Sequence, residues 1–446
     1  MDPHTSGTTE SGKIAVPSLN TPAMRRILAS SFIGSAIEFY DFILYATAAS
    51  LVFNKVFFVD LAPGVAIFAS FATLAVGYLA RPIGGIVFGH FGDRIGRKGV
   101  LIISMVMMGV ATTLIGLLPP TAAIGMLAPI VLILLRIVQG IAVGGEWGGA
   151  MLMALEHAPK ERRGFAASFA NMGGPAGAVM ATLAVSAVSV LPEEQFLAWG
   201  WRLPFLASVI LVGVGLVIRL KVSESPLFVA LEEKAERAKM PLIEVFAKYP
   251  RRVLLGTLAG MSSYTVQGLM TVWAIAIVVD EMGVSRTGVL NIKAIGALLT
   301  VIAVWFAARA SDRFGRRPVM AFGIIAGIVL AYPMIWLLGL GELWAFAIAL
   351  FLANGVVQGS IFGPFGAFTA ELFPTRMRYT GASLVYQLSS TIGAGFTPMI
   401  ASALVLLAGG ELWLVAVCWA GAFVVALIAL LALREGRTQD LTQRDF

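Results

Sequence analysis

The stretch G-D-R-I-G-R-K occupies residues 92–98, and a near copy, S-D-R-F-G-R-R, occupies residues 311–317. Each copy follows the second long apolar run of its half of the chain. A second motif, E-x-x-P-x-x-x-R, stands at residues 156–163 and returns at residues 371–378, each time after the fourth apolar run. Two motifs repeated in the same order indicate a chain built from two related halves.

The composition places these halves in a membrane. Of the 446 residues, 58% are hydrophobic and 13% are charged, and the mean hydropathy is +0.88. A soluble domain carries roughly 25% charged residues, so this chain has too few to cover a water-facing surface. A run of about 20 apolar residues crosses the hydrocarbon core as a helix.

Twelve such runs predict an all-α membrane protein with twelve transmembrane helices in two pseudo-symmetric six-helix bundles. The first run is too long for a signal-peptide core. The expected spans are 27–52, 64–88, 99–118, 127–155, 164–190, 202–220, 252–279, 288–308, 318–338, 342–370, 380–408 and 411–433.

The loop charges predict the orientation. Most of the 32 lysines and arginines fall in the tails and in the even-numbered loops, while the other side keeps Lys55, Arg202, Arg286 and Lys293. Cytoplasmic loops carry the excess of positive residues, so we expect both termini in the cytoplasm and the chain in the inner (plasma) membrane. The net charge of +7 is dispersed among these loops, which argues against a nucleic-acid partner.

The same segmentation predicts the domains. The parts are a disordered N-tail (1–26), an N-terminal bundle (27–220), a cytoplasmic linker (221–250), a C-terminal bundle (251–434) and a C-tail (435–446).

Charges inside the spans distinguish the two halves. Scaffold demands are similar in both, and ionisable groups within a membrane are costly, so an excess in one half points to function. In the aligned repeat, the N-terminal half has Glu38, Asp41, Arg136 and Glu146 where the C-terminal half has Tyr264, Gln267, Phe351 and Ile361.

Asp41 is the expected proton-coupling carboxylate, with Glu38 as the second choice and Arg136 as their partner. Helix rise places all three at similar depth. Low dielectric favours a neutral carboxyl group and a nearby arginine favours a charged one, so a changing distance between them would link proton binding to the transport state. The alternative is a static ion pair between spans 1 and 4.

Polar side chains on several spans predict a substrate cavity between the halves. Aromatic hydroxyls and amides suit hydrogen bonding to a small polar solute, although interhelical hydrogen bonds would also explain them. The expected cavity residues are Tyr45, Gln139, Glu146, Tyr264, Gln267, Asn354, Gln358, Tyr386 and Gln387.

The sequence leaves the roles of three intramembrane charges open, those of Arg81, Glu146 and Lys293. Arg81 and Glu146 lie at similar depth and either form a structural pair or take part in function. Lys293 lies about one turn into span 8, where we expect its side chain to reach back to the interface. Capture of an anionic substrate is the other interpretation.

The repeated loops predict a cytoplasmic gate. Acidic and basic groups at helix ends can pair when the halves close on that side; the alternative is that the loops only set topology, which leaves the two aspartates unexplained. The expected gate residues are Gly89, Asp93, Arg94, Arg97, Glu156, Arg163, Asp312, Arg313, Arg316, Glu371 and Arg378.

The repeated loop resembles the signature of the major facilitator superfamily. The segments E-F-Y-D-F (38–42), R-P-I-G (81–84), G-E-W-G-G (145–149), W-G-W-R-L-P-F (199–205) and E-L-F-P-T-R (371–376) resemble its metabolite:proton symporter family. That family includes shikimate, 2-oxoglutarate, citrate and proline/betaine carriers.

The resemblance covers about residues 27–435 and implies proton-coupled uptake of a small polar metabolite, a carboxylate or a zwitterion, by alternating access. It implies no cofactor besides the proton, and we expect a functional monomer. A proton-driven efflux antiporter is the alternative, since G-P-A-G-A-V at 174–179 partly matches an antiporter motif. Enzyme motifs of the zinc-protease, serine-hydrolase and P-loop types are missing from the sequence, and neither the histidines nor Cys418 has metal-ligand spacing.

Overall fold

The computed structural model describes residues 22–95, 97–144, 151, 154–155, 158, 160–221, 241–374 and 377–436. Ten of its helices are long and apolar enough to cross a membrane, and two shorter apolar helices, Ile102–Leu117 and Leu127–Val143, complete the twelve expected spans. The described part of the chain is an all-helical membrane protein, as the apolar runs predict.

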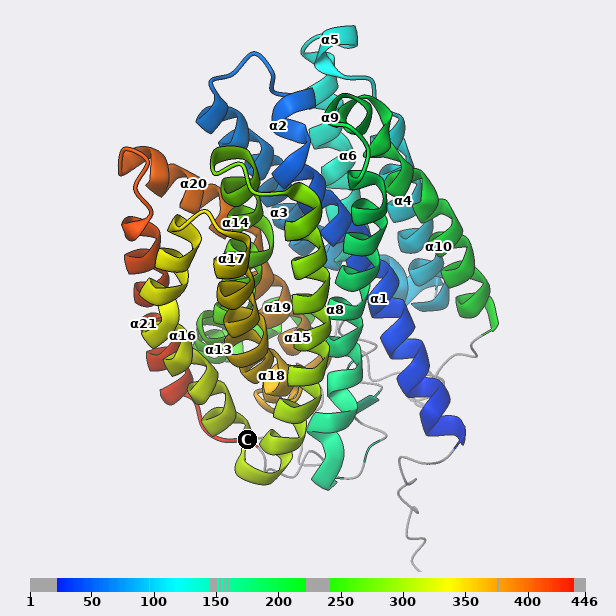
Figure 1. Ribbon diagram of the computed structural model, residues 1–446. Coiled ribbons are helices and arrows are strands. Elements are labelled where there is room, and N and C mark those ends of the chain that lie inside the picture. Colours follow the sequence, from blue (N-terminus) through cyan, green and yellow to red (C-terminus); the bar gives the residue numbers. More distant parts are fainter. Residues whose placement is uncertain are drawn as a thin grey trace, which may run out of the picture.

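The N-terminal half supplies spans 1 to 6 (Figure 1). Short helices α2 and α5 and the turn η1 lie between spans, and span 6 combines α9, the π-helical turn η2 and α10. The bounds are α1 Pro22–Leu51, α2 Phe53–Val56, α3 Pro63–Ile95, α4 Arg97–Leu117, α5 Thr121–Ile124, α6 Leu127–Val143, η1 Lys160–Arg162, α8 Arg163–Ser189, α9 Glu193–Gln195, η2 Phe196–Gly200 and α10 Arg202–Lys221.

The C-terminal half supplies spans 7 to 12, and π-helical turns interrupt spans 7, 10 and 11. A short helix, α12, precedes it. The bounds are α12 Pro241–Lys248, α13 Pro250–Gly268, η3 Leu269–Trp273, α14 Ala274–Ala276, η4 Ile277–Glu281, α15 Arg286–Phe314, α16 Arg316–Gly339, α17 Leu343–Phe351, η5 Leu352–Gln358, α18 Gly359–Glu371, α19 Arg378–Ser390, η7 Thr391–Phe396, α20 Thr397–Leu407 and α21 Trp413–Leu431.

One boundary differs clearly from the expectation. Span 6 begins at Glu193, not near residue 202. Pro192 is extended and precedes the helix, and Glu193 and Glu194 occupy its first turn, where carboxylates interact favourably with the helix dipole. These polar residues hid the start of the span from a reading based on hydropathy.

The two halves meet along two equivalent pairs of spans. Span 5 (α8) packs against span 8 (α15), while span 2 (α3) packs against span 11 (η7 and α20). Each pair joins the second span of one half to the fifth span of the other. The sequence repeat therefore has a spatial counterpart, since the two pairings exchange under the pseudo-symmetry.

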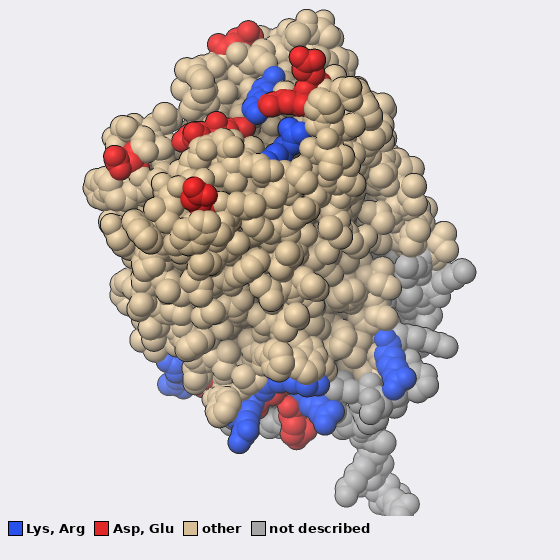
Figure 2. Space-filling view, in the orientation of Figure 1, with Lys and Arg blue, Asp and Glu red and all other residues tan. Residues whose placement is uncertain are grey.

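The surface has a broad band without charge. In Figure 2, lysine, arginine and acidic side chains gather at the two ends of the molecule, and the middle is free of them on the face shown. Large apolar side chains such as Val110, Leu114, Ile325, Val329 and Trp336 are exposed on the outer helices. An exposed apolar band is the surface that lipid tails require.

Both ends of the described chain lie on the same side of this band (Figure 1). We call it the terminal side, and the side holding α2, α5 and α9 the distal side. The predicted domain boundaries stay predictions. Most of the predicted linker, residues 222–240, lies outside the described residues.

Candidate functional site

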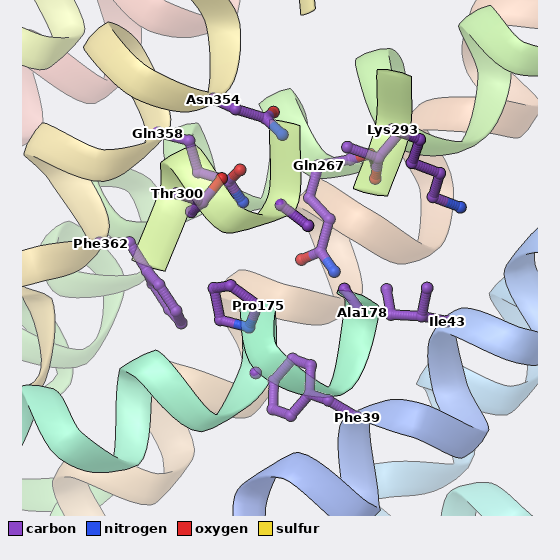
Figure 3. Close-up of a pocket in the computed structure, with 13 residues that line it drawn as sticks. Phe39, Ile43, Pro175, Ala178, Gln267, Lys293, Thr300, Asn354, Gln358 and Phe362 are labelled. Atoms are coloured by element: carbon purple, nitrogen blue, oxygen red, sulfur yellow. Dashed lines mark hydrogen bonds between the residues drawn. The ribbon is translucent and has the colours of Figure 1, made fainter. Parts of the chain in front are cut away.

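A small cavity lies between the two halves (Figure 3). Its volume is about 40 Å³, room for a few water molecules. Spans 1 and 5 contribute one wall, and spans 7, 8 and 10 contribute the other. The lining residues are Phe39, Ile43, Gly174, Pro175, Ala178, Gln267, Thr271, Lys293, Ala297, Thr300, Asn354, Gln358 and Phe362.

The polar part of this lining comes from the C-terminal half. Gln267, Asn354 and Gln358 were expected here from the sequence, and all three line the cavity. Asn354 and Gln358 belong to the π-helical turn η5, and such turns often mark functional sites. The buried Asn354 Oδ1 has no hydrogen-bond donor among the described residues, so this amide keeps capacity for a ligand.

Lys293 brings a positive charge to the cavity. Its side chain is buried, with 2% exposure, and Nζ donates to Thr47 Oγ1 on span 1 at 2.7 Å. Among the described residues no carboxylate lies within ion-pair distance of Nζ. The expectation that Lys293 reaches the interface is wrong, because span 8 directs it toward span 1 of the other half.

A chain of hydrogen bonds links the buried charges of the N-terminal half. Arg136 Nη1 donates to Gln139 Oε1 at 3.0 Å, Gln139 Nε2 donates to Thr112 Oγ1 at 2.7 Å, and Thr112 Oγ1 donates to Asp41 Oδ2 at 3.1 Å. Arg136, Gln139, Thr112 and Asp41 are all buried. Asp41 and Arg136 are therefore connected through two intermediates, and no direct ion pair joins these two described residues.

Aromatic rings hold the arginines of this region. The Arg136 guanidinium lies 4.0 Å from the ring centroid of Tyr45 and 4.4 Å from that of Phe42. The Arg81 guanidinium lies 3.8 Å from the ring centroid of Phe42 and 4.1 Å from that of Tyr78. Cation–π contacts gain strength away from water, so these rings replace part of the solvation that burial removes.

A glycine makes room for Arg136. A Cβ atom at Gly77, on span 2, would collide with the Arg136 side chain at Nε and the adjacent methylene groups. The second expected acid, Glu38, is also buried on α1, with 3% exposure. Glu146, the expected partner of Arg81, lies outside the described residues, so that pairing stays a prediction.

The terminal side carries an ion cluster in the C-terminal half. Arg316 contacts Asp312 at 2.6 Å and Glu371 at 3.1 Å, which joins the two repeated motifs of that half. Asp312 also accepts backbone N–H bonds from Gly164 and Phe165, both at 3.0 Å. Since those residues open α8, the Asp312 carboxylate caps a helix of the other half.

The other predicted gate residues are described unevenly. Arg163 begins α8, Arg313 is exposed, and Arg378 is buried with Nε donating to Ala370 O at 3.2 Å. Their gating roles stay predictions. The remaining predicted residues are Gly89, Asp93, Arg94 and Arg97, whose side chains are outside the description, and Glu156, which is wholly outside it.

The distal side has its own contacts between the halves. Lys55 Nζ lies 3.0 Å from Asp280 of span 7 and 3.0 Å from Glu193 of span 6, while Asn54 also donates to Asp280. Burial lowers the pKa of Lys55, but the hydrogen bonds and charges of Asp280 and Glu193 outweigh it and raise that pKa above its usual value. Lys55 is therefore charged at neutral pH. No sequence motif predicted that these residues would pair.

The sequence model of the Major Facilitator Superfamily matches residues 31–385 and 257–445. The chain belongs to this superfamily.

Three relatives match most of the length of this facilitator. It is 41% identical to the inner membrane metabolite transport protein YhjE of Escherichia coli K12, over 93% of this chain and 95% of the relative. It is 39% identical to the shikimate transporter of that organism, with the same coverage. It is 34% identical to the proline/betaine transporter of Salmonella typhimurium, over 86% of this chain and 78% of the relative.

Solved facilitator structures share the fold. A crystal structure of a D-xylose-proton symporter superposes with a TM-score of 0.71 at 18% identity, covering 93% of this chain and 99% of the other. A partially occluded, inward-open xylose transporter from E. coli gives the same TM-score over 94% of this chain. Together with the metabolite carriers, these findings make the chain a membrane transporter and not an enzyme.

Several polar residues predicted for the facilitator's cavity lie elsewhere in the described conformation. Tyr45 donates to Thr73 at 2.7 Å, and Gln387 donates to Gly144 O at 3.3 Å across the halves. Tyr264 and Tyr386 stack edge-to-face, with ring centroids 5.6 Å apart. The residues that do not line the cavity are Tyr45, Gln139, Tyr264, Tyr386 and Gln387.

Some contributors to the facilitator's site had only weak sequence signals. Thr112 is one of many threonines in apolar runs, and nothing in its neighbourhood marks it as the link between Gln139 and Asp41. Gly174 and Pro175 were noted for a partial motif, and both line the cavity. The apolar wall formed by Phe39, Ile43 and other residues is invisible in a sequence where most residues are apolar.

Proposed function

We propose that this facilitator is a proton-coupled symporter that takes up a small polar metabolite, a carboxylate or a zwitterion, by alternating access. The proton is its coupling ion, and it needs no other cofactor and works as a monomer. Relatives that carry shikimate or proline and betaine support the substrate class, and a relative described as an inner membrane protein supports the location.

The hydrogen-bonded chain from Asp41 to Arg136 carries this proposal. Asp41 is 2% exposed and Arg136 is fully buried, so each charge needs compensation from the protein. Two neutral side chains separate them, and the balance between the charged and neutral forms of the carboxyl group depends on how well that connection is made. A change in helix packing that alters the connection alters proton binding.

The single hydroxyl hydrogen of Thr112 gives the connection two states. Thr112 Oγ1 lies 3.1 Å from Asp41 Oδ2 and 2.9 Å from Met108 O, and it also accepts from Gln139. When Asp41 is ionised, Thr112 donates to it. When Asp41 is protonated, the carboxyl group donates to Thr112, which turns its hydrogen to Met108 O, so the hydrogen bond between Thr112 and Asp41 can form in both protonation states.

Contacts between the halves on both sides of the cavity fit alternating access. The Asp312 cap on α8 ties the terminal side, and Lys55 with Asp280 ties the distal side. Breaking one set while keeping the other would open the cavity toward one side at a time. By linkage, if substrate binding changes the proton affinity by some factor, proton binding changes the substrate affinity by the same factor.

Transport by variants in reconstituted vesicles tests the coupling. Asp41→Asn should abolish gradient-driven accumulation of shikimate or glycine betaine yet retain exchange between two filled compartments. Glu38→Gln is the parallel variant, and Arg136→Ala should impair both modes because it removes the positive end of the hydrogen-bonded chain to Asp41. If Asp41→Asn and Glu38→Gln each accumulate substrate as the parent does, the coupling site lies elsewhere.

The same vesicles separate uptake from efflux. A symporter accumulates substrate when the proton gradient points inward, and an uncoupler abolishes that accumulation. An antiporter would expel substrate under the same gradient. The position of Gly174 and Pro175 in the cavity wall keeps the antiporter as the competing function until the direction is measured.

We further propose that the terminal side faces the cytoplasm. The excess of arginine and lysine in the loops on that side supports it. Single cysteines introduced at Gly99 and Pro318, in a background where Cys418 is replaced by serine, should resist impermeant thiol reagents added to intact cells. Labelling from outside would reverse the orientation.

A further inference from the structure

Lys293 is a buried charge that the coupling network does not use. It lies on span 8 of the C-terminal half, away from the Asp41 chain, and is 2% exposed. An ionisable group buried within a membrane span is energetically unfavourable, so its presence points to a function. No carboxylate of the described chain pairs with Lys293, so a bound anion could compensate its charge.

The ammonium group has donors to spare. It carries three N–H donors, and the one acceptor recorded for it is Thr47 Oγ1 at 2.7 Å. Lys293 is one of the lining residues, and Figure 3 shows its side chain at one edge of the lining, with the nitrogen on the side away from Gln267. Two donors therefore remain for a ligand, and an anionic oxygen is the acceptor that satisfies both donors and charge.

We propose that the central cavity binds a small hydroxylated monocarboxylate, with the carboxylate group against Lys293. This rests on the proposed function, because it takes the central cavity to be the transport site.

The charges of the lining select an anion over a zwitterion. Lys293 is the one charged residue among the thirteen lining residues, all of which the structure describes. A betaine or an amino acid would bring its own cation next to this lysine, with no carboxylate of the lining to receive it. The rings of Phe39 and Phe362 could face a cation, but they share the cavity with the ammonium charge that repels it.

The single positive charge of the lining also favours a ligand with one carboxylate group over a ligand with two. A dicarboxylate would leave its second charge without a cation in the lining, and an unpaired buried charge opposes binding. The uncharged polar groups instead suit hydroxyls: Asn354 Oδ1 is a buried acceptor without a donor among the described residues, and Gln267 and Gln358 offer further amide groups.

Equilibrium binding to the purified full-length carrier tests this inference. The probes are three monocarboxylates (shikimate, lactate and benzoate), the methyl ester of shikimate, succinate and glycine betaine. At least one monocarboxylate should bind, shikimate more tightly than its ester, and succinate and glycine betaine weakly. Lys293→Gln should weaken monocarboxylate binding by about 10- to 100-fold, the range for losing a charged hydrogen bond.

Two variants complete the design. Lys293→Arg keeps the charge and should retain most of the affinity, which separates charge from packing. Lys248→Gln makes the same change of charge at an exposed residue that pairs with Glu244, and it should leave binding unchanged. Preferential binding of glycine betaine or succinate, equal affinity for ester and acid, no monocarboxylate binding, or full affinity in Lys293→Gln would each overturn the inference.

This measurement uses no proton gradient, so its failure is distinct from that of the coupling. If Asp41→Asn accumulates substrate normally while binding depends on Lys293, the coupling proposal fails and the anion site stands. If accumulation depends on Asp41 but Lys293→Gln binds normally, the anion site fails and the symporter stands.

Discussion

The two halves share an architecture and divide the chemistry between them. In the N-terminal half, Asp41 and Arg136 are buried and joined by hydrogen bonds within that half. In the C-terminal half, π-helical turns carry Asn354 and Gln358 to the cavity, and Lys293 supplies the charge. Under the proposed function, the N-terminal half would bind the coupling proton and the C-terminal half the polar groups of the solute.

The position of Lys293 sharpens the contrast. It precedes Asp312 by the same interval by which Leu74 precedes Asp93 in the other half, and Leu74 is a buried apolar residue. An apolar side chain at the matching position shows that the fold does not need a charge there. In a duplicated membrane protein, a position that is charged in one half and apolar in the other therefore indicates a functional residue.

We expect the largest effect from a change at Thr112, whose hydroxyl group connects Gln139 to Asp41 in the N-terminal half. Thr112→Val keeps the shape of the side chain but removes the link between Gln139 and Asp41. Each lost hydrogen bond to a charged group costs about 1.5–3 kcal/mol, so gradient-driven accumulation should fall by about tenfold or more. Uptake measured against external pH should also lose its steepness.

Thr113→Val is the matched control for that variant. Thr113 donates only to Gly109 O of its own helix among the described residues, and its replacement should change uptake little. Thr112→Ser should restore coupling because it restores the hydroxyl. Equal losses in both valine variants would assign the defect to helix packing instead of proton handling.

The next effect compares the two copies of the repeated loop. Asp312→Asn removes one charge from a cluster in which Arg316 also holds Glu371, and it weakens the cap on α8. Turnover should slow by about three- to tenfold, consistent with about 1 kcal/mol of lost stabilisation, while substrate affinity is spared. The assay is initial uptake rate beside equilibrium binding.

Asp93→Asn makes the same change in the N-terminal copy. A matching slowdown there would show that both loops gate the terminal side. Normal turnover in Asp93→Asn alone would make the gate asymmetric, and normal turnover in both variants would reduce the loops to topological markers.

The smallest effect is expected on the distal side. Lys55 is partly exposed, and exposed ion pairs are worth about 0.2–1 kcal/mol. Lys55→Gln should therefore shift the balance between the two open states by no more than about fivefold, measured as accessibility of a distal-side cysteine placed at Ser285. A larger shift would mean that the distal contacts, and not the terminal cluster, dominate closure.

Hydropathy and repetition predicted the architecture because both leave their mark on long stretches of sequence. The twelve spans follow from the cost of burying a polar backbone outside a helix, and the duplicated motifs pointed to Asp312, Arg316 and Glu371. Individual contacts were less accessible. The direction of Lys293 depends on how span 8 is rotated about its axis, and the pairing of Lys55 with Asp280 depends on how spans of different halves meet. A single sequence carries no local pattern for either.

The buried amides and tyrosines illustrate the same limit. Gln267 and Gln387 look equivalent in sequence, yet Gln267 lines the cavity and Gln387 donates to the backbone of the other half. Glutamine and tyrosine side chains can hydrogen-bond to a solute or to a neighbouring helix equally well. Only their surroundings in the fold distinguish a binding group from a structural one.

The contacts that join the two halves on both sides of the cavity also bear on the energy supply of the cell. The described contacts close the halves around a space that holds a few waters, so this conformation offers no broad aqueous pore through which ions could run down the membrane potential. A carrier that passes through such a state moves its cargo in discrete portions. Under the proposed proton coupling, such a carrier can be abundant in the membrane without dissipating the proton gradient that drives it.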